Sequence, residues 1–268
     1  MRILDAIGLD VTVHYGINGE SGYRFYSQFL GNVLPVTDDR GEADVQLLGY
    51  FLDDEEALDL IIEAIERSTY TTKDVKIALD VAASAWFQPS EGIYRTLKRG
   101  IEYSAEDLIS YYERLTEKYP VISIEDGIAE DDYGAWQELT ARLGKKIMLV
   151  GDDLFVTNPR LLSDGIDMGL ANAILVKPNQ VGTLTETVKT VEIARAHGYS
   201  FILSHRSGET EDTTLCDIAV ALGAPFIKAG APCRGERIAK YNRLLRIEES
   251  LCGRAEFGSE PCTSERKD

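Results

Sequence analysis

Six ionisable side chains each stand at the end of a short apolar run that is typical of a buried strand. They are Asp80, Glu125, Asp152, Lys177, His205 and Lys228. The first three are carboxylates, the hard oxygen ligands that octahedral Mg²⁺ prefers, and gathered carboxylates repel one another unless a cation is present. Any one of them could instead cap a helix or pair with a basic residue. As a set, they favour a divalent metal.

The remaining strand ends are cationic. Near a metal in a partly dry pocket, Lys177 or Lys228 would have a lowered pKa and could act as a general base, although a structural salt bridge to the same acids is an equally good reading. His205, Arg206 and Ser207 offer a cationic fork and a hydroxyl suited to phosphate or carboxylate. We expect the acidic residues 209–212 to begin the next helix, where they would complement its dipole.

The charge of the chain restricts its partners. Among 268 residues, 28 are Lys or Arg and 45 are Asp or Glu, which gives a formal charge of −17. This excess argues against binding to nucleic acid or to an anionic membrane, so a bound anion needs a local cationic pocket. Asp5 and Asp10 interrupt the N-terminal stretch, so we do not expect it to act as a signal peptide. No apolar run approaches about 18 residues, and the four cysteines lack C-x-x-C spacing. We expect a soluble, cytoplasmic protein with reduced thiols.

The pattern from residue 54 onward alternates between strands and amphipathic helices. Helices are expected over 54–68 and 104–120, and Asn158-Pro159 and Thr183–Glu186 carry the start signals of two more. Six strand-then-helix units imply a parallel sheet. Convergence of six polar strand ends favours a (β/α)8 barrel over an open sheet, because in a barrel every strand ends at one mouth.

Two further barrel strands would have to come from residues 1–53. The segment 10–25 resembles a hairpin, and 43–51 could be the strand before the first helix. We therefore expect an atypical N-terminal segment over 1–53, a barrel over 54–251 and a flexible tail over 252–268.

Long motifs along this barrel resemble the C-terminal barrel domain of enolase (phosphopyruvate hydratase). They are ALDVAAS at 78–84, SIEDGIAEDD at 123–132, VGDDLFVTN at 150–158, LVKPNQVGTLTET at 175–187, SHRSGETED at 204–212 and RIAKYNRLLRIEESL at 237–251. The resemblance implies an enolase-like (β/α)8-type barrel, incomplete at its first two strands.

The resemblance also implies a role for each matching residue. Asp80, Glu125 and Asp152 match the Mg²⁺ ligands, and Lys177 matches the base that removes the C2 proton of 2-phosphoglycerate to give an enediolate that Mg²⁺ stabilises. The expected substrate contacts are Lys228 with the carboxylate, Arg206 and Ser207 with the phosphate, and His205 in the pocket wall. A Lys base beside Mg²⁺ is a known arrangement of the enolase superfamily.

The sequence departs from the family pattern before the first helix. Enolases carry a Gly-Asp-Glu-Gly-Gly motif there, whose Glu helps to protonate the departing hydroxide, but this chain reads GEADVQLLGYFLDDEEAL. Glu42 and Asp44 would lie at the beginning of the candidate strand rather than at its end. Only ILDAIGLDVTV at 3–13 resembles the family's N-terminal domain, so the chain resembles an enolase with its middle removed.

Three functions are compatible with these features. The first is an enolase-type hydro-lyase of glycolysis that interconverts 2-phosphoglycerate and phosphoenolpyruvate. The second is a non-catalytic, truncated paralogue that acts as a binding or interaction module. The third is a reaction on a phosphorylated carboxylate that needs only proton abstraction. The expected partners are the small substrate and either a second copy or another enolase-type chain.

Overall fold

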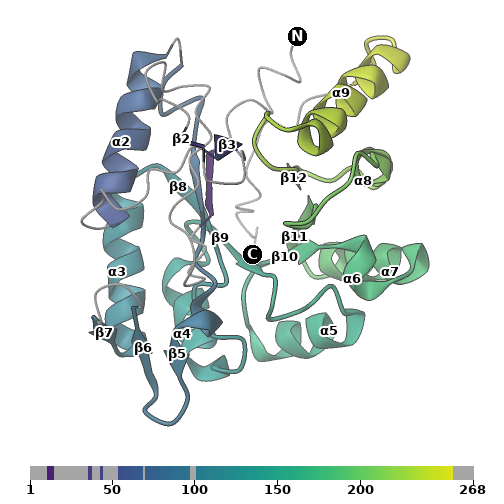
Figure 1. Cartoon of the computed structure of the whole chain (residues 1–268). Helices are drawn as coiled ribbons and strands as arrows, with labels where there is room; N and C mark the ends of the chain where they lie inside the picture. The colour runs from purple at the N-terminus through teal and green to yellow at the C-terminus, as the bar shows by residue number, and fades with distance from the viewer. Residues whose placement is uncertain are drawn as a thin grey trace. The chain divides into compact units, whose positions relative to one another are not determined.

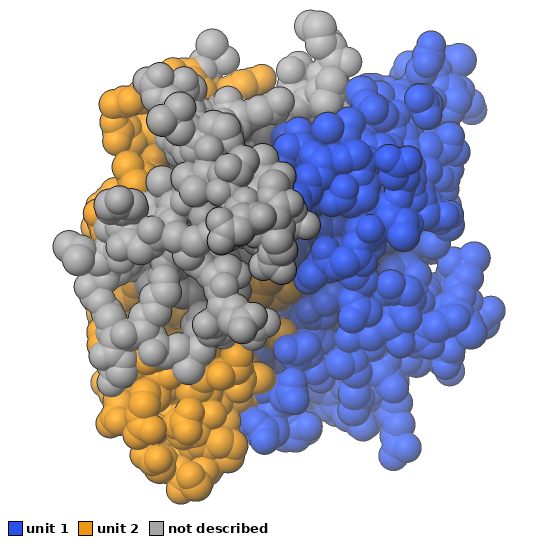
Figure 2. Space-filling model, in the orientation of Figure 1, with its two compact units in different colours: residues 1–9, 130–268 blue, residues 10–129 orange. Residues whose placement is uncertain are grey.

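The computed structural model describes residues 11–14, 36–37, 43–44, 54–68, 70–96 and 101–255. The chain divides into two compact units, shown in Figure 2. Unit 1 comprises residues 1–9 and 130–268, and unit 2 comprises residues 10–129.

Unit 2 contains three parallel strands in the order β1, β4, β8. They are β1 (Val11–His14), β4 (Ile77–Asp80) and β8 (Val121–Glu125). The early part of the chain therefore contributes a strand that runs parallel to β4. The rest of the expected hairpin lies outside the described residues. Of the segment 43–51, only β3 (Ala43–Asp44) is described, and it pairs antiparallel with β2 (Val36–Thr37).

Two long helices follow their predicted positions in unit 2. The spacing of Leu58, Ile61, Ile62 and Ile65 places them on one face of α2 (Asp54–Arg67), and all are buried except Ile62, which is partly buried. Helix α3 (Ala105–Lys118) lies within the predicted range 104–120, begins with a capping box of Ser104 and Asp107, and packs against β8. Between β4 and α3 lie the short helix η1 (Ala83–Ala85) and a small antiparallel sheet of β5 (Phe87–Gln88), β6 (Ile93–Arg95) and β7 (Glu102–Tyr103).

Unit 1 contains a parallel sheet of four strands. They are β9 (Met148–Gly151), β10 (Ala173–Val176), β11 (Ser200–Ser204) and β12 (Phe226–Lys228). Every residue of β9 and β10 is buried, because strands covered on both faces are apolar throughout. Alternate residues form one core cluster on one face, which includes Met148, Val150, Ala173, Leu175, Ile202 and Phe226.

Helices alternate with these strands along the chain (Figure 1). They are α4 (Tyr133–Leu143), α5 (Pro159–Met168), α6 (Pro178–Val181), α7 (Leu184–Ala196), α8 (Thr214–Ala221) and α9 (Gly235–Ser250). Helix α7 packs on β10 and β11, and α8 packs on β11 and β12. The Asn158 side chain caps α5 and Thr183 caps α7, as predicted.

This alternation confirms the expected α/β class with parallel strands, and the described part of the sheet is consistent with an incomplete (β/α)8 barrel. Among the described residues, no helix combines the length and the apolar character needed to cross a membrane.

The ring of Phe155 fills the space left by two glycines of unit 1. A Cβ atom on Gly165, within α5, would lie 2.5 Å from Phe155 Cε1. We therefore expect Gly165→Ala to lower the free energy of unfolding by about 1–3 kcal/mol, the usual cost of overpacking, although Ala is the better helix former. Urea unfolding would measure the difference.

Gly134 in α4 is the matched control, because a Cβ atom there would meet nothing within 4 Å. Gly134→Ala should leave stability unchanged or raise it by up to about 1 kcal/mol. Equal effects of the two substitutions would contradict the assigned clash.

Candidate functional site

All six predicted strand-end residues occupy strand ends in the structure. In unit 1, Asp152, Lys177 and His205 directly follow the last residues of β9, β10 and β11, and Lys228 is the last residue of β12. In unit 2, Asp80 and Glu125 are the last residues of β4 and β8. Parallel strands bring such residues to one edge of their sheet.

The two acids of unit 2 are neighbours across adjacent strands. Asp80 and Glu125 are register partners, and the backbone N–H of Val81 donates to the Glu125 carbonyl at 2.9 Å. Glu125 is buried, and Asp80 is partly buried. Register partners point to the same face of a sheet, so this edge presents two hard oxygen donors together.

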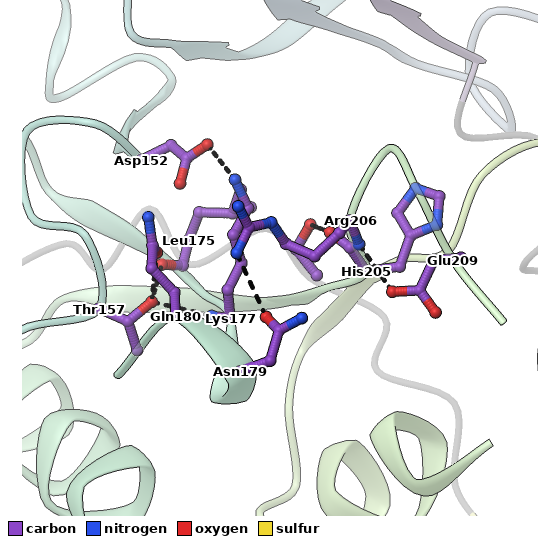
Figure 3. Close-up of polar contacts among 10 residues, drawn as sticks. Asp152, Thr157, Leu175, Lys177, Asn179, Gln180, His205, Arg206 and Glu209 are labelled. Atoms are coloured by element: carbon purple, nitrogen blue, oxygen red, sulfur yellow. Dashed lines mark hydrogen bonds and ion pairs between the residues drawn. The ribbon is translucent and has the colours of Figure 1, made fainter. Parts of the chain in front are cut away.

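In unit 1, Lys177 and Asp152 form an ion pair between the ends of β10 and β9. Lys177 Nζ donates to Asp152 Oδ2, and the two side chains are only 14% and 12% exposed (Figure 3). A pair shielded this far from water has a stronger electrostatic attraction than a surface pair. The contact confirms that the amine and the carboxylate lie together.

The predicted anion-binding residues follow β11. His205 is buried, and its backbone N–H donates to the Lys228 carbonyl at 2.8 Å. Arg206 is partly buried, and its Nη1 donates to Asn179 Oδ1 at 3.4 Å (Figure 3). Asn179 lies two residues after Lys177, so this contact brings the guanidinium close to the segment that carries the candidate base. Ser207 is exposed.

The prediction that residues 209–212 begin the next helix is wrong, because α8 starts at Thr214. Instead, Asp212 Oδ1 accepts a hydrogen bond from the Thr214 backbone N–H at 2.8 Å. Glu209 turns back and accepts the backbone N–H of Arg206 at 2.9 Å, and it pairs with Lys240 Nζ at 2.7 Å. A buried ion pair uses the carboxylate in place of the interaction with the helix dipole.

Comparison with known families identifies the fold. A family model described as "Enolase, C-terminal TIM barrel domain" matches residues 38–265. The chain belongs to this enolase family. The match includes all six strand-end residues, and it confirms the resemblance drawn from the sequence motifs at the level of the family domain.

The carboxylates of this enolase-family barrel suit a hard divalent cation. Taken as whole residues, backbone included, Asp152 in unit 1 is 8% exposed and Glu125 in unit 2 is 6% exposed. Burying a carboxylate costs free energy unless a positive charge or hydrogen bonds compensate. All the candidate ligands offer oxygen, which is the donor that Mg²⁺ and Ca²⁺ prefer over softer metals. The chemistry of the donors therefore fits the metal type expected from the sequence.

Thr157 is a residue of this site that sequence reasoning missed. Its hydroxyl accepts the backbone N–H of Lys177 at 2.9 Å and donates to Gln180 Oε1 at 3.1 Å (Figure 3). Thr157 is fully buried, and its backbone has a φ of 58°, which is unfavourable for a β-branched residue. Its place in the motif VGDDLFVTN was the only signal available.

If Lys177 is the base that the resemblance implies, Thr157→Val should slow proton exchange about 10-fold or more, because small displacements of a reacting group are costly. Val keeps the shape of Thr but cannot accept the Lys177 N–H. Thr157→Ser keeps the hydroxyl and should restore most of the rate. Solvent-deuterium exchange into a bound substrate would measure both, and equal rates for the two variants would contradict the role given to the hydroxyl.

Proposed function

We propose that this chain carries out enolase-type chemistry, namely the divalent-metal-dependent interconversion of 2-phosphoglycerate and phosphoenolpyruvate. The observation that carries the proposal is the buried pair of Lys177 and Asp152, with Arg206 held close by through Asn179. A base for a carbon-bound proton and a cation for a phosphate thus stand at the same edge of the unit 1 sheet.

The residues would divide the reaction as follows. Arg206 and Ser207 would bind the phosphate, Lys228 would contact the carboxylate, and His205 would line the pocket. Lys177 Nζ would accept the proton from C2, and the electron pair left there would form the C2–C3 double bond as the C3–O bond breaks. The departing hydroxide would take a proton from solvent and leave as water.

By the resemblance of the sequence motifs, Asp152 would be a Mg²⁺ ligand in unit 1, and Asp80 and Glu125 would be Mg²⁺ ligands in unit 2. When bound, the ion would stabilise the negative charge that builds up on the substrate carboxylate during proton removal.

A second candidate is a reaction that stops at proton abstraction. The segment GEADVQLLGYFLDDEEAL lacks the Glu that the family motif supplies for protonating the departing hydroxide. Loss of one partner of a general acid–base pair commonly costs a factor of about 10² to 10⁴. A chain with Lys177 but without that acid would exchange the C2 proton faster than it forms product.

One experiment separates these functions. Purified full-length chain would be incubated with 2-phosphoglycerate and Mg²⁺ in D₂O, and both phosphoenolpyruvate formation and deuterium incorporation at C2 would be followed. Product formation supports the hydro-lyase. Exchange without product supports proton abstraction alone. If neither occurs, and no Mg²⁺-dependent ligand binding is found, both catalytic proposals fail.

A further inference from the structure

Lys240 is a charged residue in a deeply buried position. Its exposed fraction is 1%, the lowest of any buried charged residue in the described part of the chain. Its Nζ reaches three oxygens, namely Glu209 Oε2 at 2.7 Å, the Thr210 carbonyl at 3.0 Å and the Glu236 carbonyl at 2.9 Å. All three donors of the ammonium group are therefore used. Two of the three acceptors belong to the loop that follows Arg206.

Glu209 connects this ammonium group to the anion-binding residues. One carboxylate oxygen pairs with Lys240, and the other accepts the backbone N–H of Arg206 at 2.9 Å. Burial raises the pKa of Glu209, but the hydrogen bonds from Lys240 and Arg206 and the positive charges of Lys240 and His205 outweigh it, so the pKa lies below its usual value. The carboxylate is thus ionised at neutral pH, as this bridge requires.

Lys240 lies on helix α9, and this helix also contacts Gly230, which is close to His205. The Tyr241 hydroxyl donates to the Gly230 carbonyl. A Cβ atom on Gly230, whose φ is 78°, would lie 2.5 Å from Arg237 Cδ and 2.9 Å from His205 Cε1. Helix α9 therefore approaches the segment 205–206 through Glu209 and, separately, through Gly230.

We propose that Lys240 is a positioning residue for the anion-binding segment 205–207, and that it acts through Glu209 on the backbone of Arg206. This inference rests on the proposed function, since the ligand of the segment is taken to be the substrate phosphate. Lys240 does not touch that ligand in the proposal. A buried ion pair usually stabilises a fold less than apolar packing does. We therefore assign to the pair of Lys240 and Glu209 the role of fixing the position of the Arg206 backbone.

Lys240→Met tests the proposal, because Met retains most of the stem without the charge. Two measurements are made on the full-length chain. One is hydrogen exchange of the Arg206 amide, and the other is calorimetric binding of 2-phosphoglycerate with Mg²⁺. We expect faster amide exchange and a dissociation constant raised about 10-fold, the scale of coupling from residues outside a binding site. The deuterium-exchange rate at saturating substrate should change much less.

Arg243→Met is the matched control. Arg243 also lies on α9 and pairs with a carboxylate, but that of Asp217 on α8, and these two side chains are 38% and 43% exposed. This variant should bind 2-phosphoglycerate like the unmodified chain. A second variant, Glu209→Gln, can still accept the Arg206 N–H, but its amide NH₂ replaces the carboxylate oxygen that faces Lys240. It breaks the same link, so it should weaken binding by a similar factor. It also provides the test if Lys240→Met does not fold.

Several outcomes would overturn the proposal. It fails if Arg206 amide exchange is unchanged in the folded variants, if the amide is loosened while affinity is retained, or if Arg243→Met weakens binding equally. Should the unmodified chain bind no 2-phosphoglycerate, the proposed function fails. The positioning role is then judged by Arg206 amide exchange alone, with faster exchange in its favour and unchanged exchange against it.

Discussion

Lys177→Ala should abolish incorporation of deuterium at C2 of 2-phosphoglycerate, lowering its rate by at least about 10²-fold, the usual contribution of a general base. Lys177 is the amine that contacts Asp152 at the end of β10, and its side chain is only 14% exposed. Water entering the vacated space is a far weaker base than an amine. Mass spectrometry or NMR of the recovered substrate would measure the rate.

Lys189→Ala controls for the loss of one positive charge, because Lys189 is exposed on α7 and distant in sequence from every strand end. It should retain the full rate. Circular dichroism would verify that both variants are folded. Exchange in Lys177→Ala within about 3-fold of the unmodified chain would remove Lys177 from the role of base, since such a change is well below the expected effect.

Chelating divalent cations should also stop exchange, and adding Mg²⁺ should restore it. Without a cation, no metal charge stabilises the negative charge that is created when the C2 proton is removed. We further expect Asp152→Asn to weaken Mg²⁺ binding at least about 10-fold, the lower limit seen when a metal site loses even a supporting residue. Calorimetry on the full-length chain would report the affinity without depending on turnover.

The control for the charge change is Asp164→Asn, since Asp164 is an exposed residue of α5 whose contact with Arg160 is long, at 3.9 Å. It should bind Mg²⁺ like the unmodified chain. Full exchange after chelation would contradict the metal requirement, and unchanged affinity in Asp152→Asn would exclude that carboxylate as a ligand.

The positions of the candidate residues were predictable because they depend on local signals. Apolar runs such as 173–176 fix a buried strand, and the polar residue that follows, Lys177, must then stand at the strand end. Caps such as Asn158 and Thr183 mark where the next helix begins. Each of these inferences uses only neighbouring residues, and the structure confirms them.

The supporting contacts were not predictable, because they join residues far apart in the chain. Nothing local to Lys240 indicates that its ammonium group meets Glu209 from a distant loop. The same applies to Thr157, whose hydroxyl bonds to the backbone of Lys177 twenty residues away. Glu209 shows the converse error, since its local sequence resembles a helix start, but a long-range ion pair uses its carboxylate instead.

The segment before α2 was also only partly interpretable. Its β1 strand runs parallel to β4, as a barrel requires, but its apolar pattern is short and interrupted. The family match begins at residue 38, well before α2. A weak periodic pattern cannot by itself separate a barrel strand from a hairpin arm.

The size of the Phe155 side chain restricts which residues can stand at positions 151 and 165. Its ring would lie 2.6 Å from a Cβ atom on Gly151 and 2.5 Å from one on Gly165. Gly151 ends β9 and directly precedes Asp152, so the ring sets a spacing between α5 and a candidate metal ligand. In a randomised library, or among descendants of this chain, larger side chains at 151 and 165 should arise together with a smaller one at 155. We therefore expect positions 151, 155 and 165 to vary together, next to the candidate metal ligand Asp152.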